Sequence, residues 1–169
     1  SVTLPTWRSD RRPDFTPFKI RPPEIRGFAY DRSLADELAA GSIAPAAAIE
    51  LLDDMLAIRE MEEMIVRLRS GGYEPLAGYD YRGPTHVSIG QEGTAVGASS
   101  VLRPHDRITS SHRGHGDAIA KGFSAIRRMD DAGLASRTGL PAGTPRDVLL
   151  AQALEYHLFR TIAELFGKE

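Results

Sequence analysis

Apolar side chains along residues 45–69 recur at the spacing of an α-helix. In PAAAIELLDDMLAIREMEEMIVRLR they return every three or four residues, which gathers them on one face of a helix. Pro45 suits a first helical position, and Ser70-Gly71-Gly72 ends the pattern. The sequence therefore predicts a long helix over 45–69, with its methionines filling the core. Its apolar positions are Ile49, Leu52, Leu56, Met61, Met64, Ile65 and Leu68.

A second helical pattern runs from Pro145 to about Phe166. Thr144 resembles an N-cap, followed by proline and then by an acidic residue in the first turn. Gly167 follows the last apolar position and can end the helix. The side of this helix predicted to be apolar consists of Val148, Ala151, Leu154, Leu158, Ile162 and Leu165.

Between these two patterns the chain is rich in small residues. GQEGTAVGASSVL (90–102) and the stretch from Gly114 to Gly122 are both predicted helices. Glycine inside a helix costs about 1 kcal/mol relative to alanine, but small side chains let another backbone approach closely. We therefore expect the 90–102 helix to pack against another element. RITSS (107–111) is a short strand candidate, and 73–89 and 123–143 have the composition of loops.

The first 44 residues differ from the rest of the chain. Proline is concentrated here, and it removes a backbone donor and fixes φ, which excludes a helix or a central strand. Aromatic side chains alternate with arginine and lysine in the same segment. The pattern predicts an extended arm over 1–44 before a domain over 45–169. The arm could dock on a neighbouring subunit, cover its own domain or be a disordered tail. The prolines of the arm, all within its first 23 residues, are Pro5, Pro13, Pro17, Pro22 and Pro23.

Composition excludes several classes of protein. The chain has 169 residues, 41% of them hydrophobic and 26% charged, as in ordinary globular domains. A net charge of −2 gives no field that would recruit nucleic acid or an anionic membrane. Cysteine is absent, which excludes disulfides and thiolate metal sites and fits a cytoplasmic location. No apolar run approaches a membrane span, and the first residues do not resemble a signal peptide.

Candidate chemistry is concentrated in two glycine-rich segments. His86 lies in the first, and SSHRGHGDAIAKG (110–122) brings His112, Arg113 and His115 to the start of a predicted helix. A helix start presents unpaired N–H groups and partial positive charge, and arginine adds a planar cationic fork. These features favour a phosphate or carboxylate site. The alternative is an interface loop whose histidines pair with backbone groups.

Other polar residues are given structural interpretations. A metal held by His112 and His115 is less favoured, because Asp117 is the one carboxylate that could complete the set. His157 is expected to be half-buried and structural, and His105 to be solvated. The acidic pairs Asp53-Asp54 and Glu62-Glu63 are assigned to solvated helix faces, without a functional role.

Two stretches resemble a known family. RGPTHVSIGQEGTAVGA (82–98) and HDRITSSHRGHGDAIAKG (105–122) are similar to the α subunit of thiamine-diphosphate-dependent 2-oxo acid dehydrogenases, the E1 component. SHRGHGDAIAKG looks most like the acetoin dehydrogenase branch, because other branches, such as pyruvate dehydrogenase, often carry tyrosine at the position of His112; overall the motifs are closest to the acetoin/pyruvate dehydrogenase branch. The helix over 45–69, with Arg59 and Glu62, and IAELFGK (162–168) match further family segments.

The resemblance implies a fold and an activity. The fold would be α/β, the front portion of a three-layer thiamine-diphosphate-binding fold, helix-rich here. The activity would be cleavage of the C–C bond next to a carbonyl, with transfer of the acyl group to lipoamide. His86 would lie near the reacting end of the cofactor, and His112 and Arg113 would hold its diphosphate. His115 would belong to the same active-site loop and order it.

The resemblance also implies metal ligands and partner chains outside this sequence. The family binds Mg²⁺ through a GDG…N motif that this sequence lacks, so the metal ligands are expected outside it. Expected partners are the remainder of the α subunit, an E1 β subunit or domain, and a lipoyl-bearing E2. The chain would be a piece of a larger polypeptide, a split subunit, or a degenerate assembly module without cofactor. A transketolase-like transferase is the alternative enzyme.

Overall fold

The structure, a computed structural model, divides into two units, residues 1–33 and 34–169. Little of the first unit is described, and the described part of it contains no helix or strand. The aromatic and proline residues on which the predicted arm depends therefore lie largely outside the described residues. The structure describes residues 16–17, 19, 27, 29–72, 74–75, 77–81 and 86–167.

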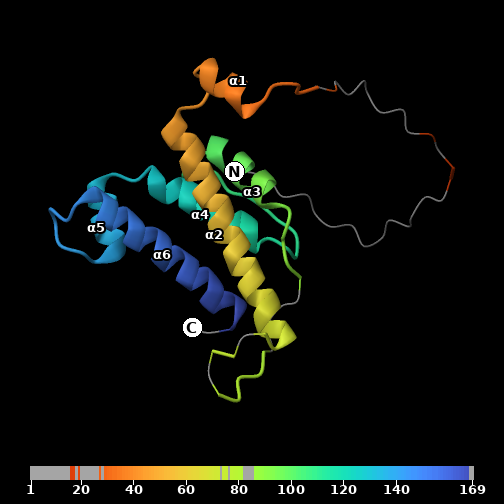
Figure 1. The fold of residues 1–169 in the computed structure, drawn as a ribbon, viewed down its shortest axis with the longest axis vertical. Helices are drawn as coiled ribbons and strands as arrows, with labels where there is room; N and C mark the ends of the chain where they lie inside the picture. The colour runs from red at the N-terminus through yellow and green to blue at the C-terminus, as the bar shows by residue number, and fades with distance from the viewer. Residues whose placement is uncertain are drawn as a thin grey trace. The chain divides into compact units, whose positions relative to one another are not determined.

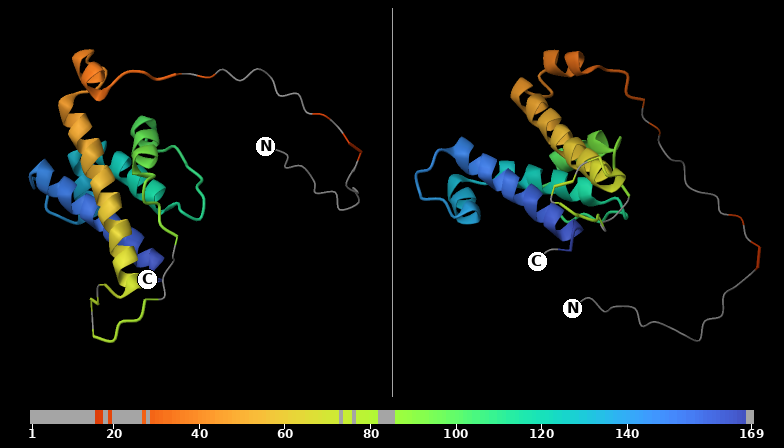
Figure 2. Two further views of the ribbon diagram at one scale, coloured as in Figure 1. Left: turned by 45° about the vertical axis from the view of Figure 1, so that its right-hand side comes forward. Right: turned by 60° about the horizontal axis from the view of Figure 1, so that its bottom comes forward.

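The second unit contains six helices within its described residues (Figure 1). Figures 1 and 2 show α2 as the longest rod, which crosses α4. Helix α4 packs against α2, α3 and α6, so it lies at the centre of the unit. The helices are α1 (Leu34–Ala39), α2 (Pro45–Ser70), α3 (Glu92–Val101), α4 (His115–Arg127), α5 (Asp131–Thr138) and α6 (Arg146–Leu165).

Helix α2 confirms the predicted helix over 45–69. Gly71 ends it in the left-handed conformation at φ 71°, which glycine adopts without strain. Its buried face begins at Asp54 and Ile58 and continues through Leu68. The first part of the predicted apolar stripe is not covered: Ile49, Leu52 and Leu56 are 60%, 50% and 50% exposed.

Two apolar clusters hold the helices together. The larger lies where α2, α3 and α4 meet, and α6 covers it with partly buried side chains. The smaller joins the end of α4 to α5 and α6 through Ile126, Leu134, Leu149 and Ala153. Leu134 and Ile58 are fully buried, one in each cluster. The buried members of the larger cluster are Ile58, Met61, Ile65, Ala95, Val96, Ile119, Ala120 and Phe123.

Helix α3 packs as its small residues predict. Ala95, Val96 and Ser99 are buried, and the Ser99 carbonyl accepts a hydrogen bond from Ser124 Oγ of α4 at 2.8 Å. The opposite side of α3 is exposed, and Val101 at its end is 80% exposed. The helix is therefore covered on one face only within the described part of the chain.

Several local predictions are wrong. The described residues contain no strand, so 107–111 is irregular and an α/β fold is not confirmed, although the helix-rich character is. A strand needs a neighbouring strand for its backbone hydrogen bonds, and none of the described segments supplies one. Helix α5 forms inside 123–143, which was expected to be loop. Its N-cap is Asp130, whose carboxylate accepts the Gly133 N–H at 2.8 Å.

Helix α1 and the start of α6 also differ from prediction. Helix α1 forms within the segment treated as an extended arm. Helix α6 begins at Arg146 with Pro145 as N-cap, because the Thr144 hydroxyl donates to the Pro141 carbonyl at 2.8 Å instead of capping the helix. None of the described helices is long and apolar enough to cross a bilayer.

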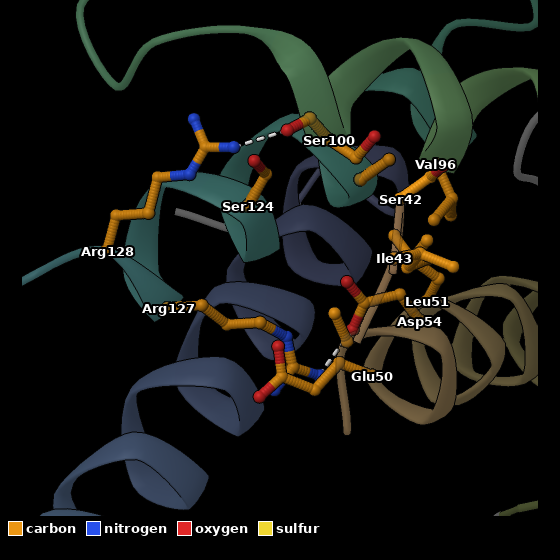
Figure 3. A pocket seen from close by; sticks show the side chains of 12 residues that line it. Ser42, Ile43, Glu50, Leu51, Asp54, Val96, Ser100, Ser124, Arg127 and Arg128 are labelled. Carbon is orange, nitrogen blue, oxygen red and sulfur yellow. Dashed lines mark hydrogen bonds and ion pairs between the residues drawn. The ribbon is translucent and has the colours of Figure 1, made fainter. Parts of the chain in front are cut away.

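A buried ion pair joins α2 to the end of α4. Arg127 Nη2 donates to Asp54 Oδ1 at 2.5 Å, and the Asp54 side chain is 6% exposed (Figure 3). Burial raises the pKa of Asp54, and the hydrogen bond from Arg127 offsets part of that rise. The pair lies beside a cavity of about 410 Å³ between α2, α3 and α4. The prediction that Asp54 lies on a solvated helix face is therefore wrong.

His157 occupies the position that the sequence predicted for a structural histidine. It lies over Gly122 of α4, and its Nε2 contacts the Ala118 carbonyl at 3.2 Å. Burial lowers the pKa of His157, so the neutral imidazole donates this hydrogen bond. A Cβ at Gly122 would lie 1.9 Å from His157 Nε2, so glycine is required for this contact.

Alanine substitution should therefore act in opposite directions at two helical glycines. Gly122→Ala displaces the His157 ring, and we expect a net loss of stability despite the gain of about 1 kcal/mol in helix propensity. Gly97→Ala in α3 meets nothing within 4 Å and should keep that gain. Urea unfolding of both variants measures the difference. Equal stabilisation by the two substitutions would contradict the His157 contact.

Candidate functional site

The structure brings the four predicted site residues together at the start of α4. The rings of His86 and His112 meet edge to face, with centroids 4.8 Å apart. His115 Nε2 lies 2.9 Å from the His86 carbonyl oxygen, and Arg113 Nη1 donates to the Val87 carbonyl at 3.3 Å. Two segments far apart in sequence, 86–91 and 110–115, therefore form one cluster, the histidine loop cluster.

The members of this cluster differ in exposure. His86, His112 and Arg113 are exposed, so their side chains can contact a ligand. The His115 side chain is 6% exposed, and both of its ring nitrogens have partners inside the protein. His115 is therefore placed to hold the cluster rather than to reach solvent.

Glu62 of α2 is the residue that sequence reasoning missed. Its side chain is fully buried and accepts three hydrogen bonds. Ser88 donates through its N–H at 3.0 Å and its hydroxyl at 2.6 Å, and His115 Nδ1 lies 2.5 Å from Oε1. The assignment of Glu62 to a solvated face is wrong. The signal was in the spacing, because Ile58 and Ile65 lie four before and three after it on the core face.

The partners of His115 determine its charge. One ring nitrogen faces a carboxylate and the other faces a carbonyl oxygen, and both of these groups are acceptors. Both nitrogens must then donate, which makes the ring an imidazolium. The hydrogen bond to Glu62 raises the pKa of His115 against the opposing effect of burial. Burial raises the pKa of Glu62, but the hydrogen bonds from His115 and Ser88 outweigh it and lower the value overall.

A second carboxylate holds the turn that follows His86. Glu92 accepts hydrogen bonds from the Gly90 N–H at 3.0 and 3.1 Å and from Arg59 Nε at 2.6 Å. The hydrogen bond from Arg59 lowers the pKa of Glu92 to about 2. Gly90 has φ 90°, a conformation that side chains rarely adopt. Two acidic residues thus fix the 86–92 segment against α2.

Glycine allows close contacts at the start of α4, both within the 110–115 segment and with Ser88 of the 86–91 segment. A Cβ at Gly114 would lie 2.8 Å from Ser110 Cβ, and one at Gly116 would lie 2.8 Å from Ser88 Oγ. Gly114 is the N-cap of α4, and no described side chain caps this helix start. The first-turn N–H groups of α4 therefore carry the partial positive charge of an uncapped helix start. Asp117 in the same turn accepts a hydrogen bond from the Ser110 hydroxyl.

Other candidate positions lie apart from this cluster. His105 is exposed, and its ring lies 4.0 Å from the neighbouring Asp106 carboxylate. Within the part of the chain that the structure describes, no three His, Asp or Glu side chains are grouped as metal ligands. The cavity beside Asp54 and Arg127 is not lined by any of the four predicted site residues.

Curated proteins of known name match this chain. The α subunit of acetoin:2,6-dichlorophenolindophenol oxidoreductase of Bacillus subtilis is 38% identical over 96 residues, covering 57% of this chain and 26% of that protein. The subunit of the same name from Cupriavidus necator is 42% identical over 52 residues, covering 31% of this chain and 16% of that protein. The pyruvate dehydrogenase E1 component subunit alpha of Rhizobium meliloti is 35% identical over 72 residues, covering 43% of this chain and 19% of that protein.

The resemblance to E1 α subunits is confirmed. The chain is homologous to part of an E1 α subunit, and the matched region spans about a quarter or less of the length of these relatives. No family model matches the chain, and no solved structure matches it significantly.

In this E1 α homologue, the buried pair Glu62–His115 should make stability depend on pH. His115 has a raised pKa, so its contribution is complete below about 6.5 and is lost as pH rises through that raised value. Glu62 has a lowered pKa, so its contribution is complete above about 4.5 and is lost on acidification through that lowered value. The pair therefore makes its full contribution to the free energy of unfolding between about pH 4.5 and pH 6.5.

Glu62→Gln should remove this stabilisation. We expect a loss of about 3–5 kcal/mol at pH near 5.5, the range for breaking a buried pair, and a smaller loss at pH near 9. Urea unfolding at both pH values measures the difference. Effects of other groups, such as His157 with its lowered pKa, occur in both proteins and cancel. A loss that is the same at both pH values would contradict the ion pair.

Proposed function

We propose that this chain supplies the diphosphate-binding loop and an active-site histidine of a thiamine-diphosphate-dependent E1 component. The enzyme would cleave the C–C bond next to the carbonyl of a 2-oxo acid or of acetoin and pass the acyl group to lipoamide. The observation that carries the proposal is the histidine loop cluster, which places Arg113, His112 and His86 at the uncapped start of α4. Homology to E1 α subunits supports it.

The residues present fit a diphosphate. Arg113 is exposed and uses one N–H on the Val87 carbonyl, and a guanidinium has five N–H donors in all. An exposed imidazole from His112 and the first-turn N–H groups of α4 lie beside it. Asp117 in the first turn of α4 accepts a hydrogen bond from the Ser110 hydroxyl, which reduces its repulsion of an anion. Glycine at 114 removes the side chain that would shield the backbone.

Each residue has a separate role in the proposal. Arg113 and His112 hold the diphosphate of the cofactor, and His86 lies toward its reacting end, where an exposed imidazole can act as a general acid or base. His115 is buried and fully bonded, so we assign it the ordering of the loop. Thiamine diphosphate, when bound, would supply a nucleophilic carbon for chemistry at the substrate carbonyl.

The metal ligands and the acyl acceptor of the proposed enzyme would come from polypeptide other than this chain. We propose that Mg²⁺ is held by a GDG…N segment in the remainder of the α subunit, and that an E1 β subunit or domain completes the site. A lipoyl-bearing E2 would accept the acyl group. The exposed apolar positions Ile49, Leu52 and Leu56 of α2 support a partner, because such side chains close together are a common feature of protein interfaces.

Arg113→Ala should weaken thiamine diphosphate binding in the assembled E1 protein. Loss of a charge-assisted contact to phosphate costs roughly 1.5–3 kcal/mol, which is about 10- to 150-fold in dissociation constant. Isothermal titration of the cofactor, with Mg²⁺ present, measures this change. Arg137→Ala on α5 is the matched control, because Arg137 is exposed and is not part of the histidine loop cluster. Equal affinities of the two variants would refute the role of Arg113.

The choice of donor can be tested on the same assembly. The names of the relatives divide between acetoin and pyruvate. We expect reduction of 2,6-dichlorophenolindophenol in the presence of acetoin or pyruvate, and none with a ketose phosphate. Activity with the ketose phosphate alone would favour a transketolase-like transferase. An assembly that binds no thiamine diphosphate would instead indicate a non-catalytic assembly module.

A further inference from the structure

We infer that Glu62 is the positioning residue of the histidine loop cluster: its buried carboxylate fixes the 86–91 segment and the start of α4 in one arrangement. It does so through Ser88 on one side and His115 on the other. The consequence for ligand binding rests on the function proposed above. The structural claim stands on the contacts alone.

The contacts of Glu62 reach both halves of the cluster. Ser88 is two residues after His86, and His115 is two residues after Arg113. One carboxylate group therefore links the segment that carries His86 to the segment that carries Arg113 and His112. His115 completes a closed circuit, because its other ring nitrogen donates to the His86 carbonyl at 2.9 Å.

The rigidity of this link follows from burial. Glu62 is fully buried and lies within the α2 face that packs against α4, so its backbone is held by the core. Hydrogen bonds to a carboxylate in such surroundings are strong, and an unpaired partner is costly. If Ser88 or His115 moved away from Glu62, a buried polar group would lose its hydrogen-bond partner. The geometry of the exposed rings of His86 and His112 therefore depends on a residue that touches neither ring.

The same helix provides a matched control. Asp54 is also a buried carboxylate of α2 that binds α4, but it binds Arg127 at the end of α4, away from the histidine loop cluster. Asp54→Asn and Glu62→Gln each remove one buried charge from α2 and keep the side-chain shape. A purely structural role would make the two variants alike. A positioning role predicts that they differ at the cluster.

Hydrogen–deuterium exchange of the assembled E1 protein tests the structural claim. In Glu62→Gln we expect faster exchange in peptides covering 86–91 and 111–116. In Asp54→Asn we expect no change in those peptides. Equal exchange at 86–91 in the two variants would overturn the inference.

Cofactor titration on the same samples tests the consequence. Glu62→Gln should weaken thiamine diphosphate binding about tenfold or more, as outer partners of binding groups do in metal sites, while Asp54→Asn keeps wild-type affinity. An unchanged affinity in Glu62→Gln would overturn the positioning role even if exchange rises. If wild-type protein binds no thiamine diphosphate, the proposed function fails, and the exchange comparison still decides the structural claim.

A milder variant covers the case in which Glu62→Gln does not assemble. Ser88→Ala removes one hydroxyl donor and leaves the Glu62–His115 pair intact. It should raise exchange at 86–91 and weaken cofactor binding less than the loss of the charge does. Wild-type exchange at 86–91 in Ser88→Ala would count against the inference.

Discussion

The arrangement of the candidate site depends on one buried ion pair. Glu62 and His115 are both removed from solvent, and each is satisfied only through the other and through the 86–91 segment. Burying two charges is costly, and well-packed apolar side chains are often as stabilising as such a pair. An ion pair does, however, impose direction and distance, which apolar contacts do not. A site that needs two loops in fixed register benefits from that constraint more than from added stability.

Small residues make the ion pair sterically possible. Gly116 lies against Ser88, and Gly114 lies against Ser110, at distances that exclude a Cβ. The start of α4 can therefore approach the 86–91 segment closely enough for His115 to reach Glu62. The same principle acts further along α4, where Gly122 admits His157. Glycines of α4 thus let both the 86–91 segment and α6 approach this central helix closely.

The sequence predicts the long helices well and the local exceptions poorly. Helices α2 and α6 follow from apolar spacing, but the exact buried face does not. In α6 the buried residues are Leu149 and Ala153, whereas Val148 of the predicted apolar side is exposed. Helix α5 was missed because it is short and depends on the Asp130 cap rather than on a repeated pattern. The strand over 107–111 was wrong because β-structure depends on a partner that local sequence does not reveal.

The candidate site shows the same division. The clustering of His86, His112, Arg113 and His115 was anticipated from glycine-rich segments and from the family resemblance. Glu62 was not, because charge on a helix is ordinarily solvated. Its spacing from Ile58 and Ile65 places it on the buried face of α2 instead. A buried carboxylate is costly unless it is paired, so this spacing predicts a buried partner for Glu62.

The exposed side of the cluster has a different physical basis from its buried side. Glu62, Ser88 and His115 are fixed by the core, whereas His86, His112 and Arg113 point from that framework to solvent. Because this framework is already ordered, a ligand pays a smaller entropic cost when it orders the groups that bind it. Arg113 contributes a permanent positive charge to this exposed side, which suits the anion of the proposed function. Under the proposed function, further polypeptide would enclose the anion, and the exposed side chains of α2 and α3 are candidates for that contact.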